Sequence, residues 1–179
     1  GNFLTMHDGS RILVTGAAGM IGANLVHRLV KEKFDPYLLL HTGGNSHRLK
    51  GLEGRVHISE GDLMDADEVG EVVNEAQPDV VFHLASTPFN PPGLDPQTHF
   101  RVNVLGTINL LESMLRFPHA RLVFTGSAAV YSEGTGLRED DAIQPGTHLG
   151  ASKGCASILL QTYAKLHGTQ TVELRLFMP

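Results

Sequence analysis

The sequence predicts an α/β fold with a doubly wound parallel sheet. Short apolar runs rich in β-branched residues alternate with longer segments of helical periodicity, which is the pattern of repeated βαβ units. The 179 residues are enough for one domain with a substantial core. We expect that domain over residues 11–179, behind an N-terminal extension or tag remnant over residues 1–10, in which Met6 is a possible original start.

The first half of the chain carries three predicted strands and two predicted helices. In chain order they are a strand at residues 11–15, a helix at 20–33, strands at 36–41 and 55–59, and a helix at 65–77. Asp65 is a plausible N-cap of the second helix, because its side-chain oxygen can accept from the free amides of the first turn. Pro78 ends the same helix, since proline cannot continue it.

The second half continues the alternation. It predicts a strand at residues 79–85, a helix at 98–117, a strand at 120–125, a helix at 149–167 and a strand at 171–176. Every predicted helix is long enough for a right-handed crossover between parallel strands. Two connections are long, at residues 42–54 and 86–97, and the second contains Pro88, Pro91, Pro92 and Pro96. Loops of that length in a compact domain are usually functional.

Composition narrows the function classes. A net charge of -5 without clustered Lys and Arg argues against nucleic acid as a partner, and the apolar stretches are too short to span a membrane. The single cysteine, Cys155, rules out an internal disulfide, and no basic-then-apolar leader opens the sequence, so we expect a cytoplasmic location. Ten histidines occur without CxxC or HExxH spacing, and we therefore expect no metal site.

A glycine motif directly follows the first predicted strand. Residues 16–22 read GAAGMIG and open the first predicted helix. The first glycine permits the tight turn, the second lets the backbone approach a pyrophosphate, and the third allows the helix to pack closely on the strand. The helix N-terminus supplies free amides and a positive dipole end for phosphates. The motif predicts a dinucleotide-binding Rossmann domain, with cofactor contacts from Gly16, Ala18, Gly19, Met20, Ile21 and Gly22.

Four further motifs extend along the chain. They read GDL at residues 61–63, HLAS at 83–86, NVLGT at 103–107 and TGSAAVY at 125–131. Together with the GxxGxxG spacing, they resemble the extended short-chain dehydrogenases/reductases, the NAD-dependent epimerase/dehydratase family that acts on nucleotide sugars. The resemblance covers essentially the whole chain and implies an NAD(P)-dependent hydride transfer at a sugar carbon that bears oxygen.

The resemblance also implies roles for individual residues. The Asp62 carboxylate would accept from the adenine amine, and Ser127 would hydrogen-bond the reacting sugar carbonyl, while Asn103 would help to organise a proton path. His83 is expected to be a core histidine rather than a catalyst. The cofactor contacts implied here are Asp62, Leu63, Leu84, Ala85, Ser86, Asn103, Thr125 and Lys153.

The end of the second predicted strand bears on the choice between NAD and NADP. An NAD site usually shows an acidic residue there, which would bind the ribose hydroxyls and repel a 2′-phosphate. Residues 40–48 contain no acid but include His41 and Arg48, in a loop that resembles those of NADP-preferring members. This favours NADP(H) over NAD(H). The alternative is that His41 and Arg48 are solvent-facing loop residues.

The catalytic block departs from the family pattern YxxxK. Lys153 is present, where it would bind the nicotinamide ribose, but the residue four positions before it is Leu149 rather than tyrosine. Leucine cannot move the proton that accompanies hydride transfer, a contribution worth about 10²–10⁴ in rate. His148 is adjacent but points about 100° away on a helix. Tyr131 resembles the family's structural tyrosine, and Tyr163 lies about 15 Å or more along the helix from Lys153. Engineering, natural loss of catalysis or a sequence slip remain possible explanations for Leu149.

The last residues resemble the start of the family's substrate lobe, RxFNxxGP, with Met178 where asparagine is expected. The small substrate lobe is then largely absent, and the chain is a fragment of a larger enzyme or a stand-alone cofactor-binding module. Two functions therefore stay open: a nucleotide-sugar epimerase, dehydratase or reductase, and a non-catalytic NAD(P)-binding module or redox sensor. The resemblance also implies a homodimer formed through the helices at residues 98–117 and 149–167.

Overall fold

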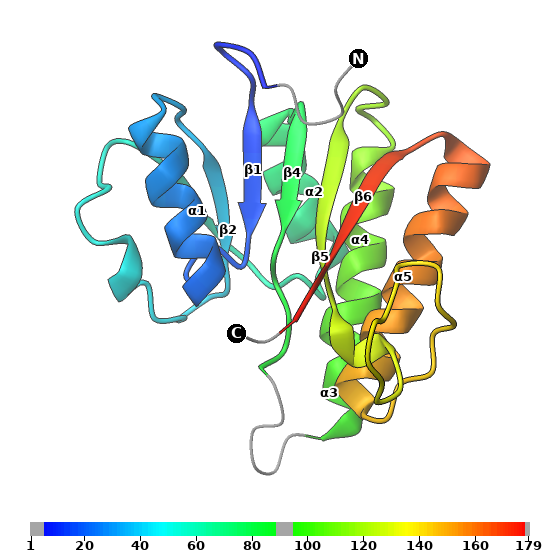
Figure 1. Cartoon of the computed structure of the whole chain (residues 1–179). Coiled ribbons are helices and arrows are strands. Elements are labelled where there is room, and N and C mark those ends of the chain that lie inside the picture. The colour runs from blue at the N-terminus through cyan, green and yellow to red at the C-terminus, as the bar shows by residue number, and fades with distance from the viewer. Residues whose placement is uncertain (1–5, 89–94, 178–179) are drawn as a thin grey trace.

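The computed structural model describes residues 6–88 and 95–177, which form a six-stranded parallel sheet with helices on both faces (Figure 1). The sheet order is β3-β2-β1-β4-β5-β6. Strands β2 and β3 are added on one side of β1, and β4, β5 and β6 are added on its other side, so the order of strands reverses between β1 and β4. The strands are β1 (Ile12–Thr15), β2 (Tyr37–Leu40), β3 (His57–Glu60), β4 (Val80–His83), β5 (Arg121–Ser127) and β6 (Gln170–Leu176). This order is that of the doubly wound Rossmann fold, as the sequence predicts, and ligands bind such sheets at the point of reversal.

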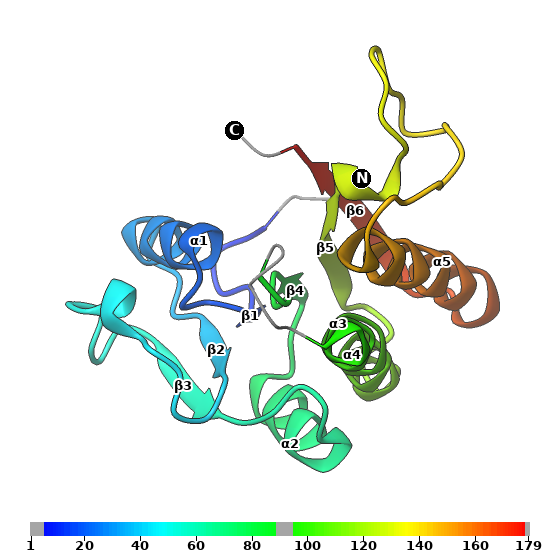
Figure 2. The ribbon, with the colours of Figure 1, turned by 90° about the horizontal axis from the view of Figure 1, so that it is seen from below.

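The helices lie in two layers (Figure 2). The helix α1 (Met20–Lys31) covers one face of the sheet, and α2 (Ala66–Ala76), α4 (Gly106–Met114) and α5 (His148–His167) cover the other. Alternate residues of β1 supply both layers: Ile12 and Val14 pack toward α1, and Leu13 packs in the core on the opposite face. A strand buried on both faces has to be apolar throughout, which explains the continuous apolar runs of the sequence.

The predicted elements are all present, with ends that differ by a few residues. The cap of α2 is as predicted, since Asp65 Oδ1 accepts from the amides of Asp67 and Glu68 at 2.9 and 3.1 Å. Gln77 then adopts a left-handed conformation with φ 42°, directly before Pro78. The third strand begins at His57 rather than at residue 55. No helix in the described part of the chain combines the length and the apolar character needed to cross a membrane.

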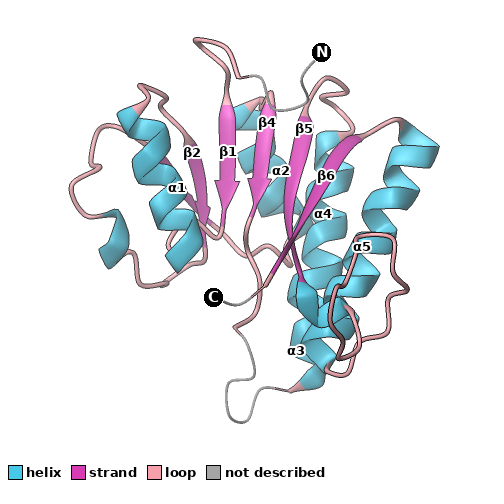
Figure 3. Cartoon of the chain, in the orientation of Figure 1, coloured by secondary structure: helices cyan, strands magenta, loops and turns pink. Residues whose placement is uncertain are grey.

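The predicted uninterrupted helix at residues 98–117 is wrong in detail. The helical run starts earlier, with α3 (Pro96–Phe100), passes through a π-helical turn, η2 (Arg101–Leu105), and ends with α4 at Met114 (Figure 3). It starts early because Asp95 caps it by accepting from the amide of Gln97 at 3.2 Å and proline suits a first turn. The widened turn carries the buried Asn103, and π turns occur frequently at functional sites.

The two long connections also differ from simple loops. The segment at residues 42–54 contains a short 3₁₀ turn, η1 (His47–Leu49), because Leu49 and Leu52 are buried against the α1 face of the sheet. Of the prolines in the second connection, Pro88 and Pro96 are described, whereas Pro91 and Pro92 lie outside the described residues. Met178 and residues 1–5 of the predicted N-terminal extension also lie outside them.

Candidate functional site

The glycine loop joins β1 to α1 in a tight turn. Gly16 has a φ of +68°, and a Cβ at this position would lie 2.5 Å from the amide nitrogen of Ala85. A Cβ at Gly22 would lie 2.2 Å from the carbonyl oxygen of Gly16. The amide of Gly19 donates to that same Gly16 oxygen at 3.0 Å and closes the turn. Backbone therefore fills the space that side chains would need, and the amino end of α1 can approach a ligand closely.

A cavity of about 510 Å³ opens above this loop at the carboxyl ends of the strands. It lies at the reversal point between β1 and β4 and is walled by the segments that follow β1, β2, β3 and β4. The predicted cofactor contacts that line it are Gly16, Ala18, Gly19, His41, Asp62, Leu63, Leu84, Ala85 and Ser86. Met20 and Ile21 are exposed at the start of α1, and Gly22 is buried beneath them.

Asp62 serves the turn that follows β3 and also lines the cavity. Its Oδ1 accepts from the amide of Met64 at 2.9 Å, and its own amide donates to Glu68 Oε2 at 2.6 Å. The residue is half-buried. Because a carboxylate has several acceptor positions, the same side chain can hold the turn and accept from a ligand.

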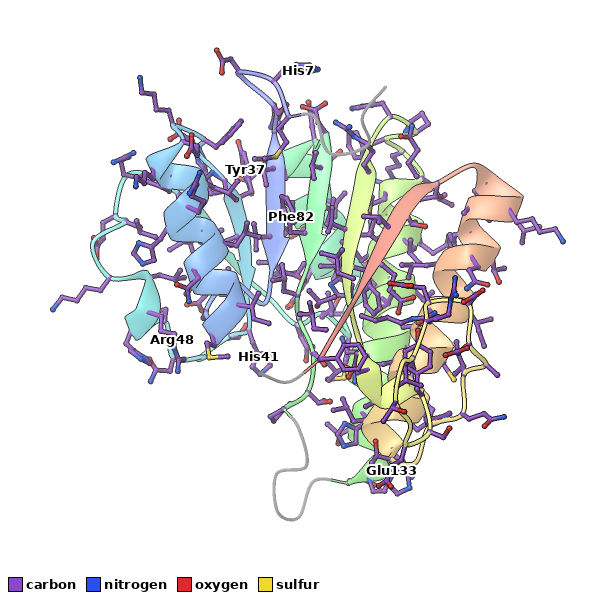
Figure 4. The ribbon with its side chains drawn as sticks, in the orientation of Figure 1. His7, Tyr37, His41, Arg48, Phe82 and Glu133 are labelled. Atoms are coloured by element: carbon purple, nitrogen blue, oxygen red, sulfur yellow. The ribbon has the colours of Figure 1, made fainter. Side chains whose placement is uncertain are left out.

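His41 and Arg48 both lie toward the carboxyl ends of the strands, near the end of β2, and His7 lies at the amino ends of the strands (Figure 4). His41 lines the cavity and is exposed. Arg48 Nη1 donates to the carbonyl oxygen of Ala18 at 3.5 Å, a long contact that nonetheless places the guanidinium beside the glycine loop. Among the described residues that line the cavity, those contributed by β2 and the loop after it include no carboxylate.

Lys153 is a buried residue of α5 whose side chain reaches β5. Its Nζ donates to the carbonyl oxygen of Thr125 at 2.9 Å and lies 4.7 Å from the centre of the Phe124 ring. Burial lowers the pKa of Lys153 to about 8, and the nearby Glu173 carboxylate opposes this shift. Thr125 Oγ1 in turn donates to the carbonyl of His83 at 3.2 Å.

The first turn of α5 places His148 and Leu149 in different surroundings. Thr147 caps the helix by accepting from the amide of Gly150 at 3.0 Å. His148 is exposed, whereas Leu149 is 6% exposed. A Cβ at Gly150 would lie 2.0 Å from the Ala129 oxygen, so the helix packs directly on the turn after β5. Ser127 accepts from the amide of Ala129 at 3.1 Å and is half-buried there.

The two remaining tyrosines considered as substitutes are held by other partners. Tyr131 is buried, and its hydroxyl accepts a hydrogen bond from Arg175, whose guanidinium also lies over the ring. Tyr163 donates to Glu112 between α5 and α4, and burial raises the pKa of Tyr163 to about 12, with Glu112 adding to the shift. Tyr131 is thus a structural residue, as predicted.

His83 is a core histidine, also as predicted. It is fully buried between Thr15 Oγ1 at 2.7 Å from Nδ1 and Thr107 Oγ1 at 2.9 Å from Nε2. Burial, with a smaller contribution from the charge of Lys153, lowers the pKa of His83 to about 3. The imidazole therefore stays neutral in the folded protein at any ordinary pH.

This burial predicts an acid sensitivity of folding. An unfolded chain protonates His83 as the pH falls through about 6.5, but the folded chain does not protonate it until about pH 3. The contribution to the free energy of unfolding is complete above pH 6.5 and falls by about 2 kcal/mol by pH 5. Urea unfolding at both pH values should show a smaller drop for His83→Gln. Titration of the His83 ring above pH 5, followed by NMR, would contradict the expectation.

Asn103 does not line the cavity but connects its wall to α5. The residue is 1% exposed, and its Nδ2 donates to Thr87 Oγ1 at 3.2 Å and to Ser152 Oγ at 2.9 Å. Thr87 is a cavity residue that the motifs did not single out, although it directly follows the HLAS segment.

Residues 6–88 and 95–177 contain no cluster of three or more side chains able to hold a metal ion.

Comparison with known proteins gives consistent matches. The sequence profile of the NAD dependent epimerase/dehydratase family matches residues 12–179. A UDP-glucose 4-epimerase of Azospirillum brasilense is 31% identical over 170 residues, which are 93% of this chain and 48% of that protein. A dTDP-glucose 4,6-dehydratase of Mycobacterium tuberculosis is 31% identical over 173 residues, with 89% and 50% covered. The chain spans about half the length of the curated relatives it matches.

Solved structures share the fold. The UDP-glucose 4-epimerase of Thermus thermophilus, crystallised in complex with NAD, matches with a TM-score of 0.81 and 30% identity, over 92% of this chain and 54% of that chain. The UDP-glucose 4-epimerase of Brucella ovis, also in complex with NAD, matches with a TM-score of 0.84 and 26% identity, over 94% and 52%.

Proposed function

The chain belongs to the NAD dependent epimerase/dehydratase family, and we propose on that basis that it binds a nicotinamide dinucleotide and acts in oxidoreduction at a sugar carbon of a nucleotide sugar. The observation that carries the proposal is the glycine loop, which closes beneath a cavity at the reversal point of the sheet. Two sequence relatives named for UDP-glucose and dTDP-glucose chemistry support the substrate class, and two structural relatives crystallised with NAD support the cofactor.

The residues present fit such a cofactor. Gly16 and Gly22, where a Cβ would collide with backbone atoms, leave the amino end of α1 open to a pyrophosphate, with Met20 and Ile21 beside it. Asp62 and Leu63 would receive the adenine, and Leu84, Ala85 and Ser86 would lie along a ribose. Lys153 would hold the second ribose, supported by Thr125 and Asn103. The bound nicotinamide supplies a hydride acceptor or donor.

Isothermal titration calorimetry with NADP⁺, NAD⁺ and NADPH tests directly whether the chain binds a dinucleotide. Binding of at least one of them is expected, and absence of binding to all three would overturn both the enzymatic proposal and the proposal of a binding module.

Within this proposal, the preferred cofactor is NADP(H). The support is the guanidinium of Arg48 beside the glycine loop and the absence of a carboxylate among the described β2-end residues of the cavity. A 2′-phosphate would gain a charge-assisted hydrogen bond there, and His41 could add a second donor.

Arg48→Ala is expected to raise the dissociation constant of NADP⁺ about tenfold and to change that of NAD⁺ by less than about twofold. Arg28→Ala is the matched control, because Arg28 is an exposed arginine of α1 paired with Glu32. Calorimetric titration measures both constants. Equal weakening of the two cofactors, or tighter binding of NAD⁺ by the native chain, would contradict the NADP preference and leave dinucleotide binding intact.

In the enzymatic proposal, Ser127 polarises the sugar carbonyl, and Lys153 orients the ribose. His148 is a weaker candidate for proton transfer, because it is exposed while the neighbouring Leu149 is buried.

The second candidate function is a non-catalytic NAD(P)-binding module or redox sensor. Leu149 favours it, since this position carries no proton-transfer group. Cofactor binding without turnover of any nucleotide sugar would support this candidate over the first.

A homodimer through α4 and α5 is also proposed. Large apolar side chains are exposed on α5 and on η2, the turn that leads into α4: Ile158, Leu166 and Leu105 are 55, 68 and 53% exposed. A cytoplasmic location is proposed as well, supported by a single cysteine, Cys155, which is exposed and free.

A further inference from the structure

Thr87 lies at the wall of the cavity, and its hydroxyl contacts a buried histidine. Thr87 lines the cavity and is 8% exposed. Its Oγ1 lies 2.6 Å from Nδ1 of His99, a residue of α3 that is 4% exposed. A hydroxyl in hydrogen-bond contact with an imidazole is the arrangement by which enzymes activate hydroxyls for proton transfer. Neither residue belongs to the motifs that predict the cofactor contacts or the catalytic residues.

Asn103 donates to the Thr87 hydroxyl and leaves the threonine proton available to His99. Its Oδ1 accepts from the amide of Thr87 at 3.1 Å, which identifies Nδ2 as the nitrogen that donates to Thr87 Oγ1 at 3.2 Å. Because Thr87 Oγ1 accepts this bond, its own proton can be donated to Nδ1 of His99. In the tautomer that carries its proton on Nε2, the imidazole accepts from the threonine hydroxyl at Nδ1 and is arranged as a base toward it.

The same amide connects the pair to the position where the family pattern has tyrosine. Asn103 Nδ2 also donates to Ser152 Oγ at 2.9 Å, and Ser152 Oγ donates to the carbonyl oxygen of Leu149 at 2.8 Å. Asn103 is 1% exposed and Ser152 is 0% exposed. The Thr87 hydroxyl therefore lies two buried, hydrogen-bonded side chains away from the backbone of Leu149.

The other histidine and threonine cluster of the core lacks this access. His83 is 0% exposed, and its ring is held between Thr15 and Thr107, which are 1 and 0% exposed. That cluster satisfies polar groups inside the fold, whereas Thr87 itself lines the cavity. The difference in access separates a structural cluster from one that can meet a ligand.

We propose that Thr87 and His99 form a proton-transfer pair that stands in for the phenol missing at Leu149, an inference that rests on the proposed function. When a sugar hydroxyl is oxidised, its O–H bond breaks, and its proton passes to Thr87 Oγ1 as the threonine proton passes to Nδ1 of His99. The C–H bond of that carbon breaks, a carbon–oxygen double bond forms, and the hydride goes to the oxidised nicotinamide dinucleotide. Reduction reverses these steps, with the imidazolium as the source of the proton.

The kinetic test uses Thr87→Val and His99→Phe, with NADP⁺ and either UDP-glucose or dTDP-glucose. Each substitution is expected to lower kcat about 10²-fold, while the NADP⁺ dissociation constant changes by less than about threefold. Thr162→Val and His119→Phe are matched controls at exposed positions outside the cavity, and they should keep the native rate. In a Leu149→Tyr background, the loss from His99→Phe should shrink to less than about threefold, because the phenol then carries the proton.

A second readout does not depend on turnover. With ¹⁵N-labelled histidine, saturation with NADP⁺ should shift the ring signals of His99 in the native chain but not in Thr87→Val, and should leave those of His119 unchanged. Three outcomes would overturn the pair: no shift of His99 at saturation, the same loss of kcat in both backgrounds, or no turnover of either sugar by a native chain that binds NADP⁺. A native chain that binds neither NADP⁺ nor NAD⁺ would instead overturn the proposed function.

Discussion

Gly22→Ala is expected to reduce dinucleotide binding by more than about 10²-fold. The added Cβ would lie 2.2 Å from the Gly16 oxygen and 2.8 Å from Ala17 Cα, and both are backbone atoms. Neither atom can move aside as a side chain could, so α1 has to shift away from the turn that presents its amides. Overpacking of this kind costs about 1–3 kcal/mol of folding stability. Calorimetric titration with NADP⁺ and urea unfolding measure the two effects.

Gly70→Ala is the matched control. Gly70 lies within α2, and the nearest atom to its added Cβ would be Ser113 Oγ at 3.9 Å, an ordinary contact distance. Alanine in a helix interior is about 1 kcal/mol more favourable than glycine, so this variant should be as stable as the native chain or more so. NADP⁺ binding by Gly22→Ala with a dissociation constant near that of Gly70→Ala would show that the close approach of α1 to the turn is not required.

Leu149→Tyr is expected to raise kcat about 10²-fold. The substitution places a phenol one helical turn before Lys153, on the same face of α5. Lys153 is buried and positively charged below about pH 8, so it lowers the cost of a phenolate beside it. General acid–base groups of this kind contribute about 10²–10⁴ in rate. Single-turnover reduction of NADP⁺ by UDP-glucose or dTDP-glucose, followed by absorbance, measures the gain.

Leu149→Phe separates the hydroxyl from the ring. Phenylalanine has nearly the size of tyrosine but cannot transfer a proton, so this variant should show no gain over the native rate. Leu149 is 6% exposed, and both aromatic residues must be accommodated in the same limited space. If Leu149→Tyr is no faster than Leu149→Phe, the position is not the site of proton transfer in this chain, and the proposal of a non-catalytic module gains support.

The gain in kcat expected from Leu149→Tyr and the loss of kcat expected from His99→Phe both depend on the proton transfer that accompanies hydride transfer. If the Thr87–His99 pair carries it in the native chain, a phenol at position 149 provides a second route, and the two changes are non-additive. If the chain is a binding module, neither change affects turnover, and the glycine loop alone accounts for its remaining function.

The order of strands and helices and the glycine loop could be predicted from the sequence alone. These features depend on residues that are neighbours along the chain: apolar runs for buried strands, Asp65 at a helix start, and the spacing of Gly16, Gly19 and Gly22. The same local pattern identified Leu149, because four residues separate it from Lys153 on one helix face. Bounds of elements were less well predicted, as the early start at Pro96 and the π turn after Phe100 show.

Which distant residues meet became visible only in the folded chain. Arg48 reaches Ala18, the glutamate of β6 lies beside Lys153 of α5, and the hydroxyl of Thr87 contacts His99 across a segment that the sequence shows only as a proline-rich loop. The physical reason is that hydrogen bonds and burial depend on the packing of whole elements: Asn103 lies in the π turn and bonds Thr87 and Ser152, which come from two other segments. A threonine or histidine in a sequence carries no sign of the partner that packing will bring to it.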